Sequence, residues 1–303
     1  MMRRILCPVD FSETSRHAIE HATAIARWYK APLTALHVYD RVFMPVPGFS
    51  VPGDRVPEAE IARLYGLVTA CFETATATGV DVTVLVDVGQ PASGILDRAA
   101  TLPADLIVMG THGASGFEHL MLGSVTEKVL RKAGCAVLTV PPHANATSTL
   151  PFKRLLCAVD FSAWSLRALE FARSLAKESG APLTVLSVIE WPWEEPPPPV
   201  FAELPAAQAA SLADYRRYVE TSAMRRLSTL IDEAASSRVA TEPRLSHGKP
   251  HVEILRTAAD IGADLIVMGV HGRKPIDLMV FGSTTNQVVR QATCPVLTLR
   301  HNT

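Results

Sequence analysis

The sequence predicts an α/β protein with two tandem domains, each a parallel β-sheet that helices cover on both faces. Three observations lead to this fold class. The second half of the 303-residue chain repeats the first at an offset of about 150 residues, short apolar runs alternate with helical patterns, and one glycine-spaced motif follows an apolar run in each half. With 48% hydrophobic residues, the chain can bury two ordinary cores.

Short apolar runs rich in β-branched residues mark five expected strands in each half. They lie near residues 4–10, 33–39, 82–88, 105–109 and 136–140, and again near 154–160, 183–189, 239–245, 264–268 and 295–299. Helical patterns separate them in the first half, at 12–28, at 58–78, from 91 onward and at 124–132. Ser12 is expected to cap the first helix, and Pro91 suits a first helical turn. Apolar strands that alternate with helices indicate a parallel sheet buried on both faces.

The repeat predicts the domain boundaries. Residues 4–12 (RILCPVDFS) return as 154–162 (RLLCAVDFS), 31–34 return as 181–184, and 135–139 match 294–298. Self-similarity of this length is typical of a duplicated domain rather than of a solenoid. A short stretch with prolines at both ends, 141–151, joins the copies, so we expect domains at 1–143 and 152–303.

Composition excludes several classes of protein. The formal net charge of −1 gives no basic footprint for nucleic acid or for an anionic membrane surface. No apolar stretch reaches the length of a transmembrane helix and the N-terminus lacks the core of a signal peptide, so we expect a cytoplasmic protein. The five cysteines form no CxxC pair or clustered ligand spacing, and we interpret them as small buried hydrophobes rather than redox or metal-binding groups.

One motif, two glycines separated by two residues and then Gly-Ser after nine more, occurs once in each half. Its copies are Gly110, Gly113 and Gly123-Ser124, and Gly269, Gly272 and Gly282-Ser283. A glycine at a strand's exit lets the backbone approach a ligand closely, and Gly-Ser at the start of a helix presents N–H groups and a hydroxyl to an anion. Two copies at identical spacing predict two similar sites for a phosphate-bearing ligand.

These residues resemble the universal stress proteins, in the tandem form with two domains of the ATP-binding type in one chain. The motif above is the nucleotide-binding pattern of that family, and a Val-Asp pair ends the first strand of each half. The resemblance implies a Rossmann-like fold of the adenine nucleotide alpha hydrolase type, with two doubly wound five-stranded sheets of strand order 3-2-1-4-5. Asp10 and Gly110 would then meet at the carboxyl ends of neighbouring strands, where open α/β sheets bind ligands.

The resemblance also implies a nucleotide site in each half, for ATP or AMP, with Mg²⁺ arriving on the ATP. Its residues in this sequence are Asp10, Val38, Gly110, Gly113, Gly123, Ser124 and Val125 in the first half and Asp160, Val188, Gly269, Gly272, Gly282, Ser283 and Thr284 in the second. The aspartates would lie at the ribose end, the backbone near the two valines would contact adenine, and the glycine motif would hold ribose and phosphates. Family members commonly dimerise through the last strand, so we expect an internal pseudo-dimer and leave a homodimer of whole chains open.

Several of these residues have a structural alternative. Ser124 with Glu127 forms a capping-box pattern, and Asp10 is also suited to cap the helix that follows it. The motif glycines are alternatively simple turn formers, although their double occurrence at one spacing favours binding. His112 and His271, next to the glycines, are interpreted as packing or backbone-bonding groups rather than as catalytic residues.

The two halves differ around the motif. Pro275 replaces Gly116, and the basic pair Arg273-Lys274, which is either a phosphate contact or a solvated pair, replaces Ala-Ser at 114–115. After its second strand, the second half carries a tryptophan- and proline-rich insert at 191–199, which we interpret as a lid, a partner-docking segment or a surface loop.

Three functional classes are consistent with these residues. The leading hypothesis is a nucleotide-binding stress-response or signalling protein that acts through an unknown protein partner. The alternatives are a slow ATP hydrolase and a scaffold that binds no nucleotide. The sequence has no GxxxxGK[ST] loop, no paired carboxylates for two metals and no obvious general base, so no catalytic or metal-binding residue is predicted.

Overall fold

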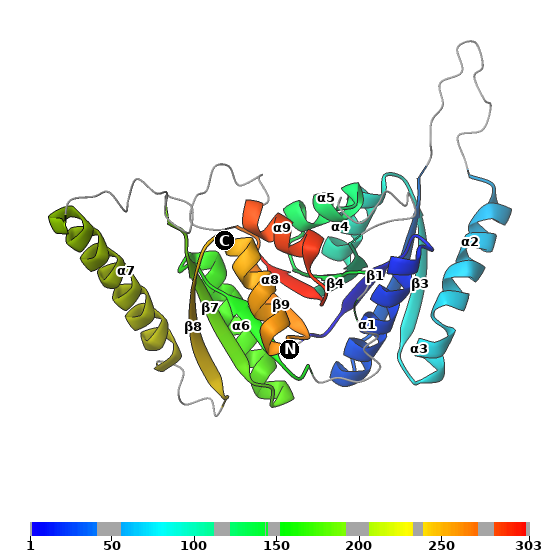
Figure 1. The fold of residues 1–303 in the computed structure, drawn as a ribbon. Coiled ribbons are helices and arrows are strands. Elements are labelled where there is room, and N and C mark those ends of the chain that lie inside the picture. The colour runs from blue at the N-terminus through cyan, green and yellow to red at the C-terminus, as the bar shows by residue number, and fades with distance from the viewer. Residues whose placement is uncertain are drawn as a thin grey trace, which may run out of the picture. The chain divides into compact units, whose positions relative to one another are not determined.

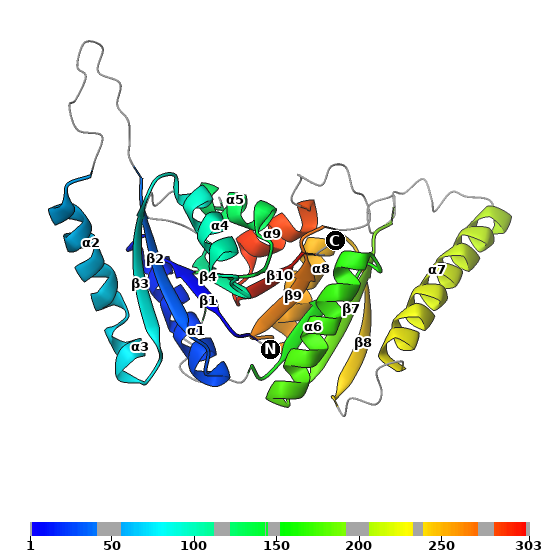
Figure 2. The ribbon, with the colours of Figure 1, turned by 180° about the vertical axis from the view of Figure 1, so that it is seen from behind.

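The structure is a computed structural model that describes residues 2–40, 56–111, 122–142, 144, 152–191, 206–232, 239–271 and 282–300. These residues form two compact α/β units, whose ribbons are drawn in Figure 1 and, from behind, in Figure 2. Unit 1 contains the described residues up to 144 together with 293–300, and unit 2 contains 152–271 and 282–292. The predicted domain boundaries, 1–143 and 152–303, follow the sequence repeat and stay a prediction.

The sheet of unit 1 has the predicted strand order 3-2-1-4-5. Its parallel strands run in the order β3-β2-β1-β4-β5. They are β1 (Ile5–Pro8), β2 (Leu33–Tyr39), β3 (Val82–Val88), β4 (Leu106–Gly110) and β5 (Ala136–Val140). Because β1 and β4 are neighbours and the chain leaves them toward opposite edges of the sheet, a topological switch point lies between their carboxyl ends.

Helices cover both faces of this sheet. They are α1 (Glu13–Tyr29), α2 (Glu58–Cys71), α3 (Glu73–Ala77), α4 (Pro91–Thr101) and α5 (Ser124–Lys132). Right-handed crossovers place α1, α2 and α3 on one face and α4 and α5 on the other (Figures 1 and 2). Ser12 caps α1 as predicted, because its side chain accepts the N–H of Ser15. The single helix expected at 58–78 is divided into α2 and α3 at Phe72, which is buried.

Unit 2 repeats this plan. Its parallel strands run in the order β9-β6-β7-β8, with bounds β6 (Leu155–Ala158), β7 (Leu183–Ile189), β8 (Thr241–His247) and β9 (Leu265–Gly269). Its helices are α6 (Ala163–Ser179), α7 (Ala206–Asp232), α8 (Pro250–Ile261) and α9 (Ser283–Gln291). The fifth strand of the second repeat, β10 (Val296–Leu299), belongs by its contacts to unit 1. Of the insert at 191–199, Trp191 alone lies within the described residues.

Cysteines on the central strands are part of the cores. Cys7 in β1 and Cys157 in β6 are fully buried, and neither forms a disulfide. Burial raises the pKa of the Cys157 thiol to about 12 and raises the pKa of Cys7 as well. Both thiols therefore stay protonated at neutral pH, where a thiol is a poor nucleophile and a poor metal ligand. This agrees with their interpretation as small buried hydrophobes.

Strand β10 extends the sheet of unit 1 beyond β5. The two strands pair antiparallel, as predicted for the last strands of the two repeats. The Thr139 hydroxyl donates to the carbonyl oxygen of Val296 at 3.2 Å, and the Thr298 hydroxyl donates to that of Val137 at 3.3 Å. Because β5 has a neighbour on each side, its apolar edge is not left exposed to pairing with other chains.

Proline at position 138 tests this pairing. Leu138 lies opposite Leu297 and is 1% exposed. Leu138→Pro removes a ladder donor and a buried side chain, so we expect the β10 amides to lose their protection against hydrogen exchange, with a loss of stability of about 3 kcal/mol. The control Leu138→Val keeps the N–H group and should keep β10 protected. Unchanged exchange of β10 in the proline variant would contradict the pairing.

Candidate functional site

The carboxyl ends of β1 and β4 place two parts of the predicted site at one edge of the sheet. These strands are paired in parallel, Asp10 follows β1 by two residues, and Gly110 is the last residue of β4. Unit 2 has the same arrangement, in which Asp160 follows β6 and Gly269 ends β9. The structure therefore brings the aspartate and the first glycine of each half to the switch point of its sheet.

Asp10 and Asp160 each hold the start of the following helix. Oδ1 of Asp10 accepts hydrogen bonds from the N–H of Ser12 at 3.1 Å and from its hydroxyl at 2.6 Å. Ser12 in turn accepts the N–H of Ser15 at 3.1 Å. Asp160 makes the same two contacts with Ser162, at 3.0 and 2.6 Å. The alternative in which Asp10 is itself the helix cap is wrong, because Ser12 is the cap and Asp10 orients it.

The turn that presents each aspartate is backbone-strained. Phe11 and Phe161, which follow the aspartates, both have a φ of 64°. A left-handed conformation costs a non-glycine residue on the order of 1 kcal/mol, so neighbouring contacts must hold the turn. In unit 1, Nδ1 of His37 lies 2.8 Å from the carbonyl oxygen of Val9, and its ring centroid lies 4.7 Å from that of Phe11. In unit 2, the guanidinium of Arg226 lies over the Phe161 ring at 4.1 Å.

Helix packing requires the first glycine of each motif. A Cβ on Gly110 would lie 3.0 Å from the Cβ of Thr14 and 3.2 Å from the Thr14 carbonyl carbon and oxygen. A Cβ on Gly269 would lie 2.9 Å from the carbonyl carbon of Trp164. The first turn of α1 or α6 thus lies directly against the end of β4 or β9. The sequence predicts that a ligand lies close to the backbone at these two glycines. In the structure, the first turn of α1 or α6 takes that place.

Hydrogen bonds close the base of the motif loop. The N–H of Gly123 donates to the carbonyl oxygen of Thr111 at 2.9 Å, and the hydroxyl of Thr126 on α5 donates to that of Gly110 at 2.9 Å. The equivalent bonds in unit 2 measure 3.1 and 2.9 Å. Both ends of the loop are therefore fixed to the end of the fourth strand. The loops themselves, 112–121 and 272–281, lie outside the described residues. They contain seven residues that the sequence analysis discussed, namely His112, Gly113, Gly116, Gly272, Arg273, Lys274 and Pro275.

Helix α5 begins with a glycine cap. Gly123 is the N-cap residue, with a φ of −58° and a ψ of 136°, and no side chain caps the helix. Ser124 is exposed in the first turn, next to the half-buried Val125. The capping-box alternative is wrong, because Ser124 is already the first helical residue and the N–H of Glu127 donates to the carbonyl oxygen of Gly123 at 2.9 Å.

Helix α9 of unit 2 begins in the same way. Gly282 is the N-cap residue, and Ser283 and Thr284 lie in the first turn. A Cβ on Gly282 would lie 2.9 Å from the carbonyl oxygen of Val270, so this position requires glycine if the loop is to close. The first N–H groups of a helix have no acceptor within the helix, and a glycine cap supplies none. Both helix starts are therefore suited to an anion with several oxygen atoms.

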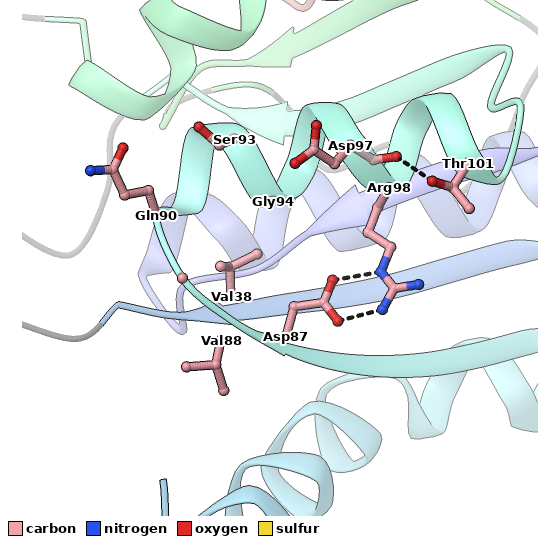
Figure 3. A pocket seen from close by; sticks show the side chains of 10 residues that line it. Val38, Asp87, Val88, Gln90, Ser93, Gly94, Asp97, Arg98 and Thr101 are labelled. Atoms are coloured by element: carbon pink, nitrogen blue, oxygen red, sulfur yellow. Dashed lines mark hydrogen bonds and ion pairs between the residues drawn. The ribbon is translucent and has the colours of Figure 1, made fainter. Parts of the chain in front are cut away.

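A pocket of about 360 Å³ opens at the carboxyl ends of β2 and β3 in unit 1 (Figure 3). It is lined by Val38, Asp87, Val88, Gly89, Gln90, Ser93, Gly94, Asp97, Arg98 and Thr101. Gly94 brings α4 against Val38, since a Cβ there would lie 3.1 Å from both Val38 methyl carbons. Asp87 holds Arg98 through two contacts, at 2.5 and 2.6 Å (Figure 3). The volume falls in the range of small-molecule sites, about 300–1,000 Å³.

Of the predicted site residues, Val38 lines this pocket, and sequence reasoning missed the rest of it. The signal that could have found it is the Gly-Gln-Pro sequence at 89–91. Gly89 has a φ of 151° and donates its N–H to the carbonyl oxygen of Tyr39 at 3.0 Å, and Pro91 then opens α4. A glycine of this conformation before a proline indicates a tight strand-to-helix turn. Val188, the counterpart of Val38 in β7, is half-buried.

His271 packs against an aromatic side chain. Its ring lies edge-on to that of Trp164, with the centroids 5.0 Å apart. This supports the interpretation of His271 as a packing residue. Within the described ranges, no group of three or more His, Cys, Asp or Glu side chains is placed to hold a metal ion. None of the helices in these ranges is both long enough and apolar enough to cross a membrane.

Gly110→Ala tests the packing role of the first motif glycine. The added methyl would meet backbone atoms of Thr14, which cannot swing away, so we expect a loss of stability of about 1–3 kcal/mol. Gly66→Ala in α2 is the matched control, because a Cβ there meets nothing within 4 Å. It should gain up to about 1 kcal/mol from helix propensity. Chemical denaturation measures both variants, and equal stability would show that α1 does not need the glycine.

Comparison with known proteins assigns the chain to a family. A model of the universal stress protein family matches residues 1–141 and again 151–300. A universal stress protein of Methanocaldococcus jannaschii is 34% identical over 142 residues, which are 46% of this chain and 82% of that protein. Another, from Thermus aquaticus, is 36% identical over 141 residues, 46% of this chain and 99% of that protein.

A solved structure agrees with the fold of the whole chain. The crystal structure of a universal stress protein from Archaeoglobus fulgidus matches with a TM-score of 0.73 and 24% identity, over 98% of this chain and 96% of that one. At this identity the match shows the fold alone. Since the family model matches twice and covers nearly every residue, this chain belongs to the universal stress protein family, as a tandem of two such domains.

Proposed function

We propose that this chain is a cytoplasmic adenine-nucleotide-binding protein of stress response or signalling, with one nucleotide site at the carboxyl edge of each sheet. One observation carries the proposal. At that edge, each unit brings together an aspartate after its first strand, the glycine exit of its fourth strand and the glycine-capped start of the next helix. In unit 1 these are Asp10, Gly110 and Gly123, and the pocket at Val38 opens at the same edge.

Each part suits a different portion of the ligand. The first turn of α5, with Ser124 and Val125, would hold phosphate oxygens, because backbone N–H groups and the helix dipole favour an anion. Asp10 would lie at the ribose end, since a carboxylate accepts hydrogen bonds from sugar hydroxyls but repels phosphate. The pocket at Val38 would take the adenine ring. The corresponding residues of unit 2 are Asp160, Val188, Gly269, Gly282, Ser283 and Thr284, and Gly113 and Gly272 would join the phosphate end of their halves.

The proposed ligand class is an adenine nucleotide, ATP or AMP, with Mg²⁺ bound through the phosphates of ATP rather than by a protein cage. One universal stress protein whose solved structure covers 46% of this chain is in complex with cAMP. All three ligands share adenine and ribose and differ in their phosphates. Because the ends of the motif loop are fixed to β4, the same helix start could bind the phosphate groups of all three ligands.

We also propose that the bound nucleotide is a signal read by a protein partner. A slow ATP hydrolase is the second candidate function, and a domain pair without nucleotide is the third. Oδ1 of Asp10, the acid at the switch point, accepts two hydrogen bonds from Ser12 and so orients the start of α1, which favours a binding role over that of a general base. The pairing of β5 with β10 supports an internal pseudo-dimer of the two repeats, and a homodimer of chains would use other surfaces.

Gly123→Val tests the phosphate end of the site. Valine can adopt the φ of −58° and ψ of 136° of Gly123, but at the equivalent Gly282 an added Cβ would meet the Val270 carbonyl oxygen. We therefore expect a loss of stability of about 1–3 kcal/mol, and a melting curve checks that the variant folds. Its branched side chain would stand at the first turn of α5 and block the approach of phosphate. We expect calorimetry to show that the nucleotide bound by unit 1 is lost.

The matched control is Gly134→Val. Gly134 lies just before the amino end of β5, whereas the candidate site lies at the carboxyl ends of the strands. A Cβ at Gly134 meets nothing within 4 Å, so this variant should bind nucleotide like the parent protein. Unchanged binding stoichiometry in the Gly123 variant would show that the phosphate end lies elsewhere.

Turnover of ATP separates the first candidate function from the second. We expect hydrolysis far below the median enzyme turnover of about 10 s⁻¹. The measurement is steady-state phosphate release from full-length protein with Mg²⁺. A metal-dependent rate above about 1 s⁻¹ would show that the protein is an ATP hydrolase. It would contradict the proposal that the protein binds ATP without hydrolysing it rapidly.

A further inference from the structure

The two halves share one backbone scaffold beside β3 and β8. A glycine follows each strand, Gly89 with a φ of 151° and Gly248 with a φ of 130°. Each donates its N–H at 3.0 Å to the carbonyl oxygen at the end of the neighbouring strand. A proline then opens α4 or α8, and the fourth helical residue, Gly94 or Glu253, donates its N–H to the N-cap carbonyl oxygen at 2.9 or 3.1 Å. Gly94 and Glu253 therefore hold the same position on the same scaffold.

The side chain at this position differs and changes the space available. In unit 1, Gly94 has no side chain, and the pocket of about 360 Å³ is open between it, Asp87 and Gly89 (Figure 3). In unit 2, Glu253 is 6% exposed. Its carboxylate accepts a hydrogen bond from the hydroxyl of Ser246. Ser246 is the counterpart of Asp87, since the two pair with equivalent valines of β7 and β2.

The Glu253 carboxylate also lies against the turn glycine. A Cβ on Gly248, the counterpart of Gly89, would lie 3.5 Å from Oε1 of Glu253. Arg256, one turn along α8, donates to Oε2 of the same carboxylate. The carboxylate thus lies between Ser246 and Gly248, whose counterparts both line the open pocket of unit 1. It fills the space that Gly94 leaves free.

The other face of the end of β8 is covered as well. The ring of His247 stacks on Trp191, with centroids 5.9 Å apart and planes inclined by 6°. Nε2 of His247 lies 3.1 Å from a carboxylate oxygen of Glu220 on α7, and the Arg216 guanidinium lies over the Trp191 ring at 5.4 Å. The counterpart of His247 in unit 1 is Val88, which is 41% exposed and lines the pocket. Contacts on both faces therefore hold the end of β8 in place.

We propose that the two nucleotide sites are unequal, because the Glu253 side chain closes the base end of the site in unit 2. This inference rests on the proposed nucleotide binding by both units. In the described residues the two phosphate ends are built alike, whereas adenine would meet an open pocket in unit 1 and a buried, hydrogen-bonded carboxylate in unit 2. Displacing such a group leaves its partners unsatisfied, so unit 2 binds the same nucleotide at least about tenfold more weakly than unit 1.

Calorimetric titration of the full chain with Mg²⁺-ATP, repeated with AMP, tests this inequality. Two binding phases are expected, one site per chain that binds tightly and one at least about tenfold weaker. Glu253→Ala removes the carboxylate arm but keeps Cβ and helix propensity. In that variant the weak phase should strengthen by about tenfold and approach the tight one. Gly123→Val should remove the tight phase and so assign it to unit 1.

Matched variants separate volume from charge. Glu253→Gln keeps the size of the side chain and should leave the second site weak. Arg256→Ala removes a side chain that is 62% exposed and leaves the carboxylate in place, so it should also leave the second site weak. Gly94→Gln places a side chain of the same size in unit 1 without a new charge beside Asp87, and it should weaken the tight site by about tenfold, with its melting curve confirming that it folds. Gly94→Ala adds only the Cβ that meets the Val38 methyls and should weaken the site less than Gly94→Gln.

The outcomes distinguish this inference from the proposed function. Two sites of equal affinity in the parent protein would overturn the inequality and leave nucleotide binding intact. A second site that stays weak in Glu253→Ala would overturn the assignment to Glu253. If neither the parent protein nor any variant binds ATP or AMP, the proposed function itself fails, and the inference fails with it.

Discussion

The geometry of the candidate site depends on the contact between the first turn of α1 and the end of β4. Gly110 allows Thr14 to lie where a Cβ would otherwise stand, and this brings the turn that carries Asp10 to the end of the neighbouring strand. From the opposite face of the sheet, Thr126 of α5 bonds to the Gly110 carbonyl oxygen. Helices on both faces of the sheet therefore contact Gly110. These two contacts fix the distance between Asp10, before α1, and the start of α5. A side chain at position 110 would push α1 away and change this spacing before any ligand is bound.

The sequence predicted the strands, their order in unit 1 through the family resemblance, the Ser12 cap and the pairing of the last strands. It placed Asp10 and Gly110 at the ends of neighbouring strands, as the structure confirms, but it did not predict the contacts that they make there. A glycine in a sequence does not show what comes close to it, so the close approach at Gly110 was expected from a ligand and is made by a helix. The capping box was wrong because Gly123 and Ser124 can both precede a helix. Tertiary structure decides between them, since Gly123 bonds to Thr111 and closes the loop.

The buried position of Glu253, on which the proposed closure of unit 2 depends, could in part have been predicted from the sequence, although nothing in the glycine motif indicates it. On α8, Glu253 belongs to the same buried stripe as Ile254, Thr257 and Ala258. A carboxylate on the apolar face of an amphipathic helix is rarely buried without partners. That pattern could have marked the position as special, but its partner Ser246 lies on another element and follows only from the register of β7 with β8. Alignment of the two repeats would have placed glycine opposite glutamate without showing the open space on one side.

The two proposed sites differ most in the contacts that an entering base would have to break. In unit 1, the pair of Asp87 with Arg98 forms part of the pocket wall (Figure 3). Under the proposed binding mode, adenine would not have to separate this pair. In unit 2, a base that took the equivalent position would first have to displace Glu253 and break its hydrogen bonds to Ser246 and Arg256. Glu253 is buried, whereas Arg256 is 62% exposed and can bond to water instead, so the cost falls mainly on the carboxylate. Breaking the bonds of a buried polar group costs about 1–3 kcal/mol, which is a large part of the binding free energy of a small ligand. On the proposed binding mode, the residue at this position would act on affinity through the empty state of the site. The glutamate would stabilise a closed form, and a glycine would leave nothing to displace.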